Sequence, residues 1–302
     1  MWLVTGVSGQ LGSVLLKQLI DARLPAFGVA SPRGPLPSFG DTERVELTDD
    51  GALEAIVARL RPRFIVHAAA VAAVATAHAD PDRARRVNVD ATSVLCRAGA
   101  RSGARVVYVS TDMVFDGENA PYDEDATPSP LSDYGRSKLL GERAALAEGA
   151  LVARLPLMYG LPAVERNTTF VEQVKLLRQR KPLRLFHDEF RSPLWLEDAA
   201  SSLVRVAQSD LSGRLHVGGP ERLSRLEMGE LLVGALGVPR PDIESVGRND
   251  VASSEPRARD LSLSSKRYAE AFGVAPGRTM REALEAVRDA LRWSDVQSLG
   301  TP

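Results

Sequence analysis

The sequence predicts an α/β fold: a doubly wound parallel sheet with helices on both faces and a smaller C-terminal substrate lobe. Short apolar runs alternate with amphipathic segments through the first half of the chain, as in consecutive βαβ units. The runs are apolar throughout rather than at every second position, as expected of strands buried on both faces. The second half is less regular, and we assign most of it to the smaller lobe.

Each element of the first half is predicted from an apolar run or a helical spacing. Helical spacing is clearest at Leu11, Val14 and Leu15, just after a glycine-rich turn. Strands are expected at 2–5, 26–30, 64–68, 105–110 and 151–155. Helices are expected at 10–22, 50–60, 82–102 and 132–148.

The second half carries two clear helix starts. Ser224 and Glu227 have capping-box spacing, as do Thr279 and Glu282, so helices are expected from these points to about 236 and about 293. Further helices are expected at 168–180 and 197–207. Loops are expected at 31–40, 117–130 and 237–260, and the last nine residues are expected to fray.

Composition excludes several classes of protein. The 302 residues carry 38 basic and 39 acidic side chains, a balance without the footprint of a nucleic-acid or membrane partner. Cys96 is the single cysteine, so an internal disulfide and a cysteine-based zinc site are excluded, and a reducing compartment fits. The four histidines show no ligand spacing, so no metal is predicted. No signal peptide or membrane-length apolar run is recognised, so we expect a cytoplasmic protein.

A glycine-rich turn joins the first strand to the first helix. Gly6, Gly9 and Gly12 stand in a GxxGxxG spacing, where the strand ends and the helix begins. A dinucleotide pyrophosphate needs close backbone approach and the free N–H groups of a helix N-terminus. The turn therefore predicts a Rossmann-type dinucleotide site.

The end of the second strand indicates which dinucleotide is preferred. An acidic residue there would bind the ribose 2′-hydroxyl of NAD, but none occurs before Asp41. Ser31 and Arg33 are suited instead to the 2′-phosphate of NADP. NADP(H) is thus the preferred cofactor, with NAD(H) as the second choice.

A tyrosine and a lysine stand four residues apart at the start of the fourth helix. This spacing places Tyr134 and Lys138 on one helical face, where an ammonium can lower the pKa of the phenol. Such a pair can protonate a carbonyl oxygen while hydride reaches its carbon. Thr111, at the carboxyl end of a predicted strand, is placed to hydrogen-bond the same carbonyl, although capping of the strand end would explain it equally well.

The motifs together resemble a known family. They are TGVSGQLG at 5–12, HAAAVAAV at 67–74, VNVDAT at 87–92, STDMVFDG at 110–117 and YGRSKLLGE at 134–142. With them the chain is similar to the extended short-chain dehydrogenase/reductases, and most similar to the dTDP-4-dehydrorhamnose reductase family. The resemblance covers nearly the whole length and is stronger over the first 160 residues.

This resemblance implies roles for individual residues. Thr111, Tyr134 and Lys138 would form the catalytic triad, with Asp112 assisting at the carbonyl. Substrate contacts are expected from Val114, Leu157 and Arg191. Together with the turn, the resemblance predicts the cofactor-binding set: Gly6, Ser8, Gly9, Gln10, Leu11, Gly12, Ser31, Arg33, Glu46, Leu47, Ala68, Ala69, Ala70, Asn88, Tyr134 and Lys138. Residues 1–160, with a return at 186–208, would bind NADP(H), and 161–302 would mainly bind substrate.

Two departures bear on the substrate. Leu157 stands where the rhamnose reductases usually carry a tryptophan that packs on the sugar, and Leu194 replaces a threonine. Three hypotheses follow: a reductase of a keto group on a nucleotide-linked deoxysugar, a reductase of a non-sugar carbonyl compound, and a non-catalytic NADP-binding regulatory subunit. The regulatory subunit of methionine adenosyltransferase is similar to this family and illustrates the third. A small-molecule substrate is expected in all enzymatic cases, and a homodimer fits the resemblance.

Overall fold

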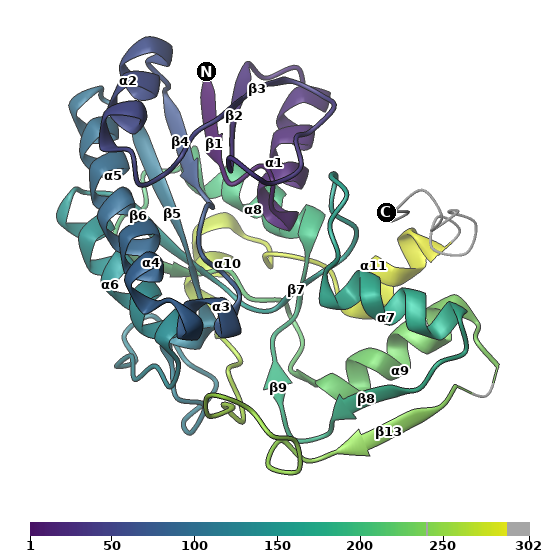
Figure 1. The fold of residues 1–302 in the computed structure, drawn as a ribbon. Helices are drawn as coiled ribbons and strands as arrows, with labels where there is room; N and C mark the ends of the chain where they lie inside the picture. Colours follow the sequence, from purple (N-terminus) through teal and green to yellow (C-terminus); the bar gives the residue numbers. More distant parts are fainter. Residues whose placement is uncertain (240, 289–302) are drawn as a thin grey trace.

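The larger part of the protein is built on one parallel sheet. The computed structural model describes residues 1–239 and 241–288. Seven strands lie in the order β11-β6-β5-β4-β1-β2-β3, and the order reverses next to β1 (Figure 1). The strands are β1 Trp2–Thr5, β2 Ala26–Ala30, β3 Asp41–Arg44, β4 Phe64–His67, β5 Arg105–Thr111, β6 Leu151–Leu155 and β11 Arg214–His216. Doubly wound sheets bind ligands at the carboxyl edge beside such a reversal.

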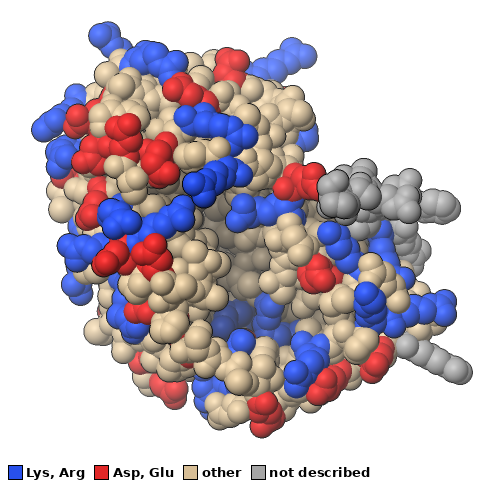
Figure 2. All heavy atoms as spheres, in the orientation of Figure 1, with Lys and Arg blue, Asp and Glu red and all other residues tan. Residues whose placement is uncertain are grey.

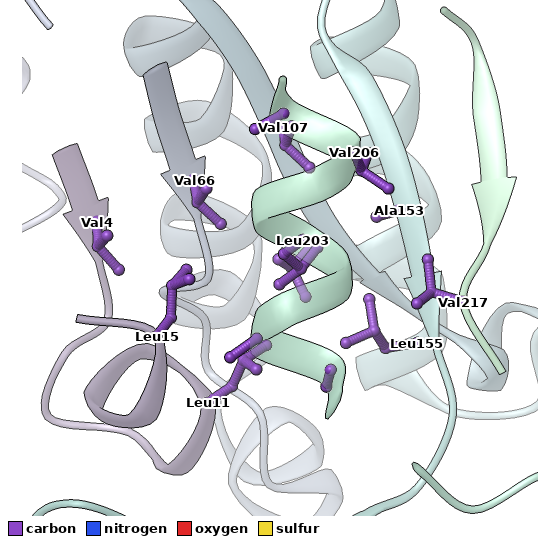
Figure 3. Packing of buried hydrophobic residues seen from close by; sticks show 14 of the residues in the cluster. Val4, Leu11, Leu15, Val66, Val107, Ala153, Leu155, Leu203, Val206 and Val217 are labelled. Atoms are coloured by element: carbon purple, nitrogen blue, oxygen red, sulfur yellow. The ribbon is translucent and has the colours of Figure 1, made fainter. Parts of the chain in front are cut away.

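Successive strand residues face opposite hydrophobic layers. In β1, Leu3 belongs to one buried cluster and Val4 to the other. In β4, which lies beside β1 in the sheet, Ile65 and Val66 divide in the same way. Figure 3 shows α1 Gln10–Asp21 and α8 Leu196–Ala207 packing onto one layer, for example through Leu203. The helices α2 Asp50–Leu60, α5 Ala91–Arg101 and α6 Asp133–Ala147 cover the other face. Both faces are covered, which explains the uniformly apolar strand sequences.

The segment predicted as one helix at 82–102 is divided. It comprises α4 Pro81–Arg85, a π-helical stretch Arg86–Asp90 and then α5, and a further short helix, α3 Val74–Ala79, precedes it. Pro81 begins a new helix because its missing N–H is harmless at the first helical position, and the Asp80 carboxylate accepts from the Arg83 amide. The π-helical stretch carries Asn88.

The smaller part has its own hydrophobic cluster, which includes Tyr159, Phe170 and Trp195. Figure 1 shows it beside the sheet. Its elements are β7 Met158–Tyr159, α7 Thr169–Arg178, β8 Leu183–Phe186, β10 Leu194–Trp195, α9 Arg225–Leu236, β13 Ile243–Val246 and α11 Met280–Ala286. The pair β9 Phe190–Arg191 and β12 Leu223–Ser224 lies nearby, and α10 Lys266–Phe272 packs toward the large sheet through Tyr268.

Several elements escaped prediction for identifiable reasons. β3 is an edge strand whose Asp-Thr-Glu-Arg sequence is largely exposed, so it carries no apolar signal. The loop prediction at 237–260 is wrong at β13, which pairs with β8. Both predicted capping boxes are confirmed. The end of the helix predicted to about 293, and the nine residues expected to fray, lie outside the described residues.

Within the described ranges, no helix combines the length and apolar character needed to cross a membrane.

Candidate functional site

The glycine turn forms a backbone cradle at the carboxyl edge of β1. Gly6 has a φ of +80°, and a Cβ there would come within 2.7 Å of the Ala69 amide nitrogen. A Cβ on Gly12 would overlap the Gly6 carbonyl. Gly9 caps α1 without any side-chain hydrogen bond, so the first N–H groups of the helix remain for a ligand. Helix N-termini of this kind bind phosphate groups.

The loop after β2 folds against this turn. The Ser31 amide donates to Ser8 Oγ at 3.1 Å, so the two predicted cofactor-binding serines meet. Sequence reasoning missed Arg44, at the end of β3, whose Nη1 donates to the carbonyls of Ser31, Pro32 and Gly34 at 2.8–3.0 Å. Arg44 thus shapes the loop that presents the exposed Arg33.

The remaining predicted cofactor residues lie around the same edge. The Ala69 amide donates to Thr5 Oγ1 at 3.3 Å, which ties the end of β4 to β1 beside Gly6. Leu47 is buried and Glu46 exposed on the segment after β3. Gln10 and Leu11 open α1, and Ala68 and Ala70 flank Ala69 after β4.

Asn88 is buried below the edge of the sheet where the other predicted cofactor residues lie. Its side chain is buried, its Oδ1 accepts from the Val71 amide at 2.8 Å, and its Nδ2 donates to Ser137 Oγ at 2.9 Å. Asn88 therefore links the segment after β4 to α6, the helix that carries Tyr134 and Lys138.

Tyr134, Lys138 and Thr111 are brought together where β5 ends and α6 begins. Burial raises the pKa of Tyr134 to about 12, although its hydrogen bond with Thr111 acts in the opposite direction. At neutral pH the phenol is therefore protonated, which is the form that can donate a proton to a carbonyl oxygen.

Lys138 is held from two sides. Its Nζ donates to the Val109 carbonyl at 2.7 Å and stands 4.0 Å from the centre of the Tyr108 ring. Burial lowers the pKa of Lys138 to about 7, while the Glu142 carboxylate acts to raise it. The ammonium therefore titrates near neutrality.

Asp112 faces an arginine of the smaller part. Thr111 Oγ1 donates to Asp112 Oδ1 at 3.0 Å, and Arg191 Nε, on β9, lies 3.8 Å from Oδ2. Burial raises the pKa of Asp112, against the effects of Arg191 and the Thr111 hydrogen bond. Thr111 and Asp112, at the end of β5, thus meet Arg191 from a distant segment.

A cavity of about 230 Å³ lies beside this point. Arg191 lines it, together with Met113, Glu189 and Arg257, none of which sequence reasoning identified. Figure 2 shows that the molecule is hollowed between its larger and smaller parts, with Lys and Arg side chains around the hollow. A further guanidinium, Arg225 at the start of α9, has its pKa lowered to about 10 by burial and then by Arg191.

Two expectations for the substrate side need correction. Val114 is fully buried in a hydrophobic cluster with Phe115 and Tyr122, so it is not available to a substrate. Leu194 is also fully buried, in the main core, so its difference from threonine says little about substrate. Leu157 is partly exposed and packs against the core of the smaller part.

A buried ionic network connects α6 to the sheet through Glu142. Arg154 donates to both carboxylate oxygens of Glu142 at 2.7–2.8 Å, and Ser110 Oγ donates to Glu142 at 2.6 Å. Arg154 Nη1 also lies 3.3 Å from His216 Nε2 on β11. The network joins β5, β6, α6 and β11, and only the folded chain brings these residues together.

Comparison with known proteins identifies the family. The family model described as "RmlD substrate binding domain" matches residues 1–293. The chain belongs to the RmlD family. This confirms the resemblance read from the motifs, and the seven-stranded sheet confirms the predicted fold class.

Proteins similar to this chain include an enzyme and a subunit of another enzyme. Methionine adenosyltransferase 2 subunit beta of Bos taurus is 31% identical, over 90% of this chain and 82% of that protein. The dTDP-4-keto-6-deoxy-D-glucose reductase of Streptomyces niveus is 30% identical, over 94% of each. The fold matches dTDP-4-dehydrorhamnose reductase of Bacillus anthracis in complex with NADP, with a TM-score of 0.84, 23% identity and coverage of 94% of this chain and 97% of the other.

Proposed function

We propose that this protein is an NADPH-dependent reductase of a keto group on a nucleotide-linked deoxysugar. The observation that carries the proposal is the meeting of Thr111, Tyr134 and Lys138 at the carboxyl edge of the sheet, beside a cavity. The Streptomyces relative, named as a reductase of a dTDP-linked keto sugar, supports the substrate class.

The nucleotide cradle fits the proposed cofactor. The close approach at Gly6 and Gly12 leaves no room for a Cβ, as a pyrophosphate site requires. Ser31 and Arg33 would bind the 2′-phosphate, and the Bacillus structure with NADP supports this choice. When bound, the reduced nicotinamide would supply the hydride. Residues 1–160 with the return at 186–208 would form this site, and β11, at 214–216, adds a further strand to its sheet.

The side chains have distinct roles in the proposed reaction. Tyr134 donates its phenolic proton to the carbonyl oxygen as the carbon is reduced. Thr111 hydrogen-bonds that oxygen and orients it, and Lys138 holds the cofactor ribose and lowers the cost of forming the Tyr134 phenolate. Arg191, Arg225 and Arg257 supply guanidinium donors beside the cavity, which suit the phosphates of a nucleotide-linked substrate.

Two alternatives rest on particular observations. The identity to methionine adenosyltransferase 2 subunit beta favours an NADP-binding regulatory subunit. The leucine at 157, with Met113 in the cavity wall, favours a non-sugar carbonyl substrate. The assembled Thr111, Tyr134 and Lys138 favour turnover over a purely regulatory role.

The test follows nicotinamide absorbance with NADPH or NADH and dTDP-4-dehydro-6-deoxy-L-lyxo-hexose. Oxidation that prefers NADPH and disappears in Tyr134→Phe is expected, because the phenol is the proton donor. Tight NADPH binding without oxidation of this sugar would sink the proposal. A panel of other ketones would then separate a different reductase from a regulatory subunit.

A further inference from the structure

Three side chains from separate segments meet beside the cavity, which one of them, Glu255, lines. They are His78 in α3, Asp133 at the start of α6 and Glu255 in the loop after β13. Each offers one ligand atom, and the three atoms lie within 4.8 Å of one another. His78 Nδ1 is 2.9 Å from Asp133 Oδ2 and 3.8 Å from Glu255 Oε1. Their separation in sequence explains why no ligand spacing was visible.

In both Asp133 and Glu255, one carboxylate oxygen accepts a hydrogen bond from the protein, and the second oxygens differ in their surroundings. Asp133 Oδ1 accepts from Arg136 Nη2 at 2.6 Å, and Glu255 Oε1 accepts from the Asp133 amide at 2.6 Å. Asp133 Oδ2 faces His78. Glu255 is only 6% exposed, and its Oε2 is buried without a hydrogen-bond partner.

This arrangement leaves negative charge to be offset. A buried carboxylate oxygen without a donor or cation is costly. Arg136 contacts both carboxylates, at 2.6 Å and 3.6 Å, so one guanidinium faces two carboxylates. The cluster therefore has room, in charge and in hydrogen bonding, for a further cation.

We propose that His78, Asp133 and Glu255 bind a divalent transition metal, with Zn²⁺ the best match. One imidazole nitrogen and two carboxylate oxygens are ligand types that Zn²⁺ accepts. Bonds of about 2.0–2.2 Å would place ligand atoms about 3.4 Å apart, so Glu255 would move inward and the His78–Asp133 pair would open slightly. His78 is 46% exposed, which provides an entry path and a coordination position for water.

The site would join two walls of the cavity. Glu255 and its neighbour Arg257 line the cavity, and Asp133 immediately precedes Tyr134. A bound metal would therefore tie the Glu255 loop to the N-terminal end of α6. This role goes beyond the proposed reductase function and does not depend on turnover.

The chain offers a matched control for the experiment. His67 and His216 are buried, as is the thiol of Cys96, so none of them is accessible to added metal. His187 is the other exposed histidine; it lies 3.2 Å from Ser245 Oγ and is no part of the cluster. His187→Ala removes an imidazole from the surface without touching the proposed site.

The test is isothermal titration calorimetry, in which ZnCl₂ is added to chelator-treated, tag-free full-length protein. The visible absorption spectrum of the protein with added Co²⁺ provides a spectroscopic readout of the same site. We expect one equivalent to bind, with affinity at least about tenfold weaker in His78→Ala and Glu255→Gln and unchanged in His187→Ala. Circular dichroism would confirm that each variant is folded. If Glu255→Gln does not fold, the comparison of wild type with His78→Ala, a substitution at an exposed residue, is the deciding one. No binding by the wild type, or equal binding by wild type and His78→Ala, would overturn the proposal and leave the cluster as an ion pair.

Discussion

The two sides of the central cleft are built on different principles. The cofactor side is made from backbone: contiguous residues from Gly6 to Gly12 turn from a strand into a helix, and the absence of side chains shapes the site. The proposed substrate side is made from side chains: Met113, Arg191 and Arg257 come from three distant segments. A site of the first kind is local in sequence, whereas one of the second kind exists only after folding.

The largest expected effect tests the backbone side. Gly12→Ala would place a methyl group against the Gly6 carbonyl, so we expect NADPH affinity to fall about 100-fold and unfolding free energy to fall by about 2 kcal/mol. Fluorescence titration and chemical denaturation would measure these losses. Gly234→Ala, in α9 with open space around it, is the control and should stabilise the protein by up to about 1 kcal/mol. Similar behaviour of the two variants would contradict a close-packed turn.

A substitution on the side-chain wall should have a different signature. Arg191→Ala removes a guanidinium from the cavity, so we expect KM for the keto substrate to rise about tenfold while KM for NADPH stays constant. Steady-state kinetics with each substrate varied in turn would separate the two constants. Arg101→Ala, at a 71% exposed side chain, is the charge control. A change confined to the NADPH constant would place Arg191 on the wrong side of the cleft.

Arg44 is a side chain on the cofactor side of the cleft, where it holds the loop after β2 through hydrogen bonds to backbone carbonyls. Its loss should loosen the loop that holds Ser31 and Arg33, so Arg44→Ala is expected to raise KM for NADPH about fivefold, with little change for NADH. The ratio of the two KM values is the measurement. An equal rise for both cofactors would show that the loop does not discriminate the 2′-phosphate.

The last prediction concerns Lys138, which lies between the two sides, and it addresses the pH dependence of stability rather than binding. Burial lowers the pKa of Lys138 from 10.5 to about 7, so between these values the unfolded state binds more protons than the folded state. The stability contributed by this group is therefore complete above pH 10.5 and is lost as the pH falls from 10.5 to 7, with a slope of up to about 1.4 kcal/mol per pH unit. Unfolding free energies of wild type minus Lys138→Met across this window would show the rise. A flat difference would mean that the ammonium remains protonated in the fold.

Sequence patterns predicted elements whose signals are local. The buried strand predicted at 105–110, the capping box at Ser224 and the glycine turn each depend on a few consecutive residues, and the structure contains all three. The edge strand β3 has no such signal because its side chains face solvent. Val114 was misjudged because the motif around it was expected to bind substrate as a whole, while its own side chain is buried in a hydrophobic cluster with Phe115 and Tyr122.

By itself, the sequence determined the fold class, the glycine turn and the placement of Tyr134 and Lys138 one turn apart in a helix, because strand burial, turn geometry and helical spacing are short-range properties. Only the tertiary structure decided which side chains meet across long separations. It brought Arg44 to the Ser31 loop, Arg154 to Glu142 and His78 to Glu255. These contacts depend on how strands are ordered and how the smaller part closes on the sheet, and no pattern of neighbouring residues records that.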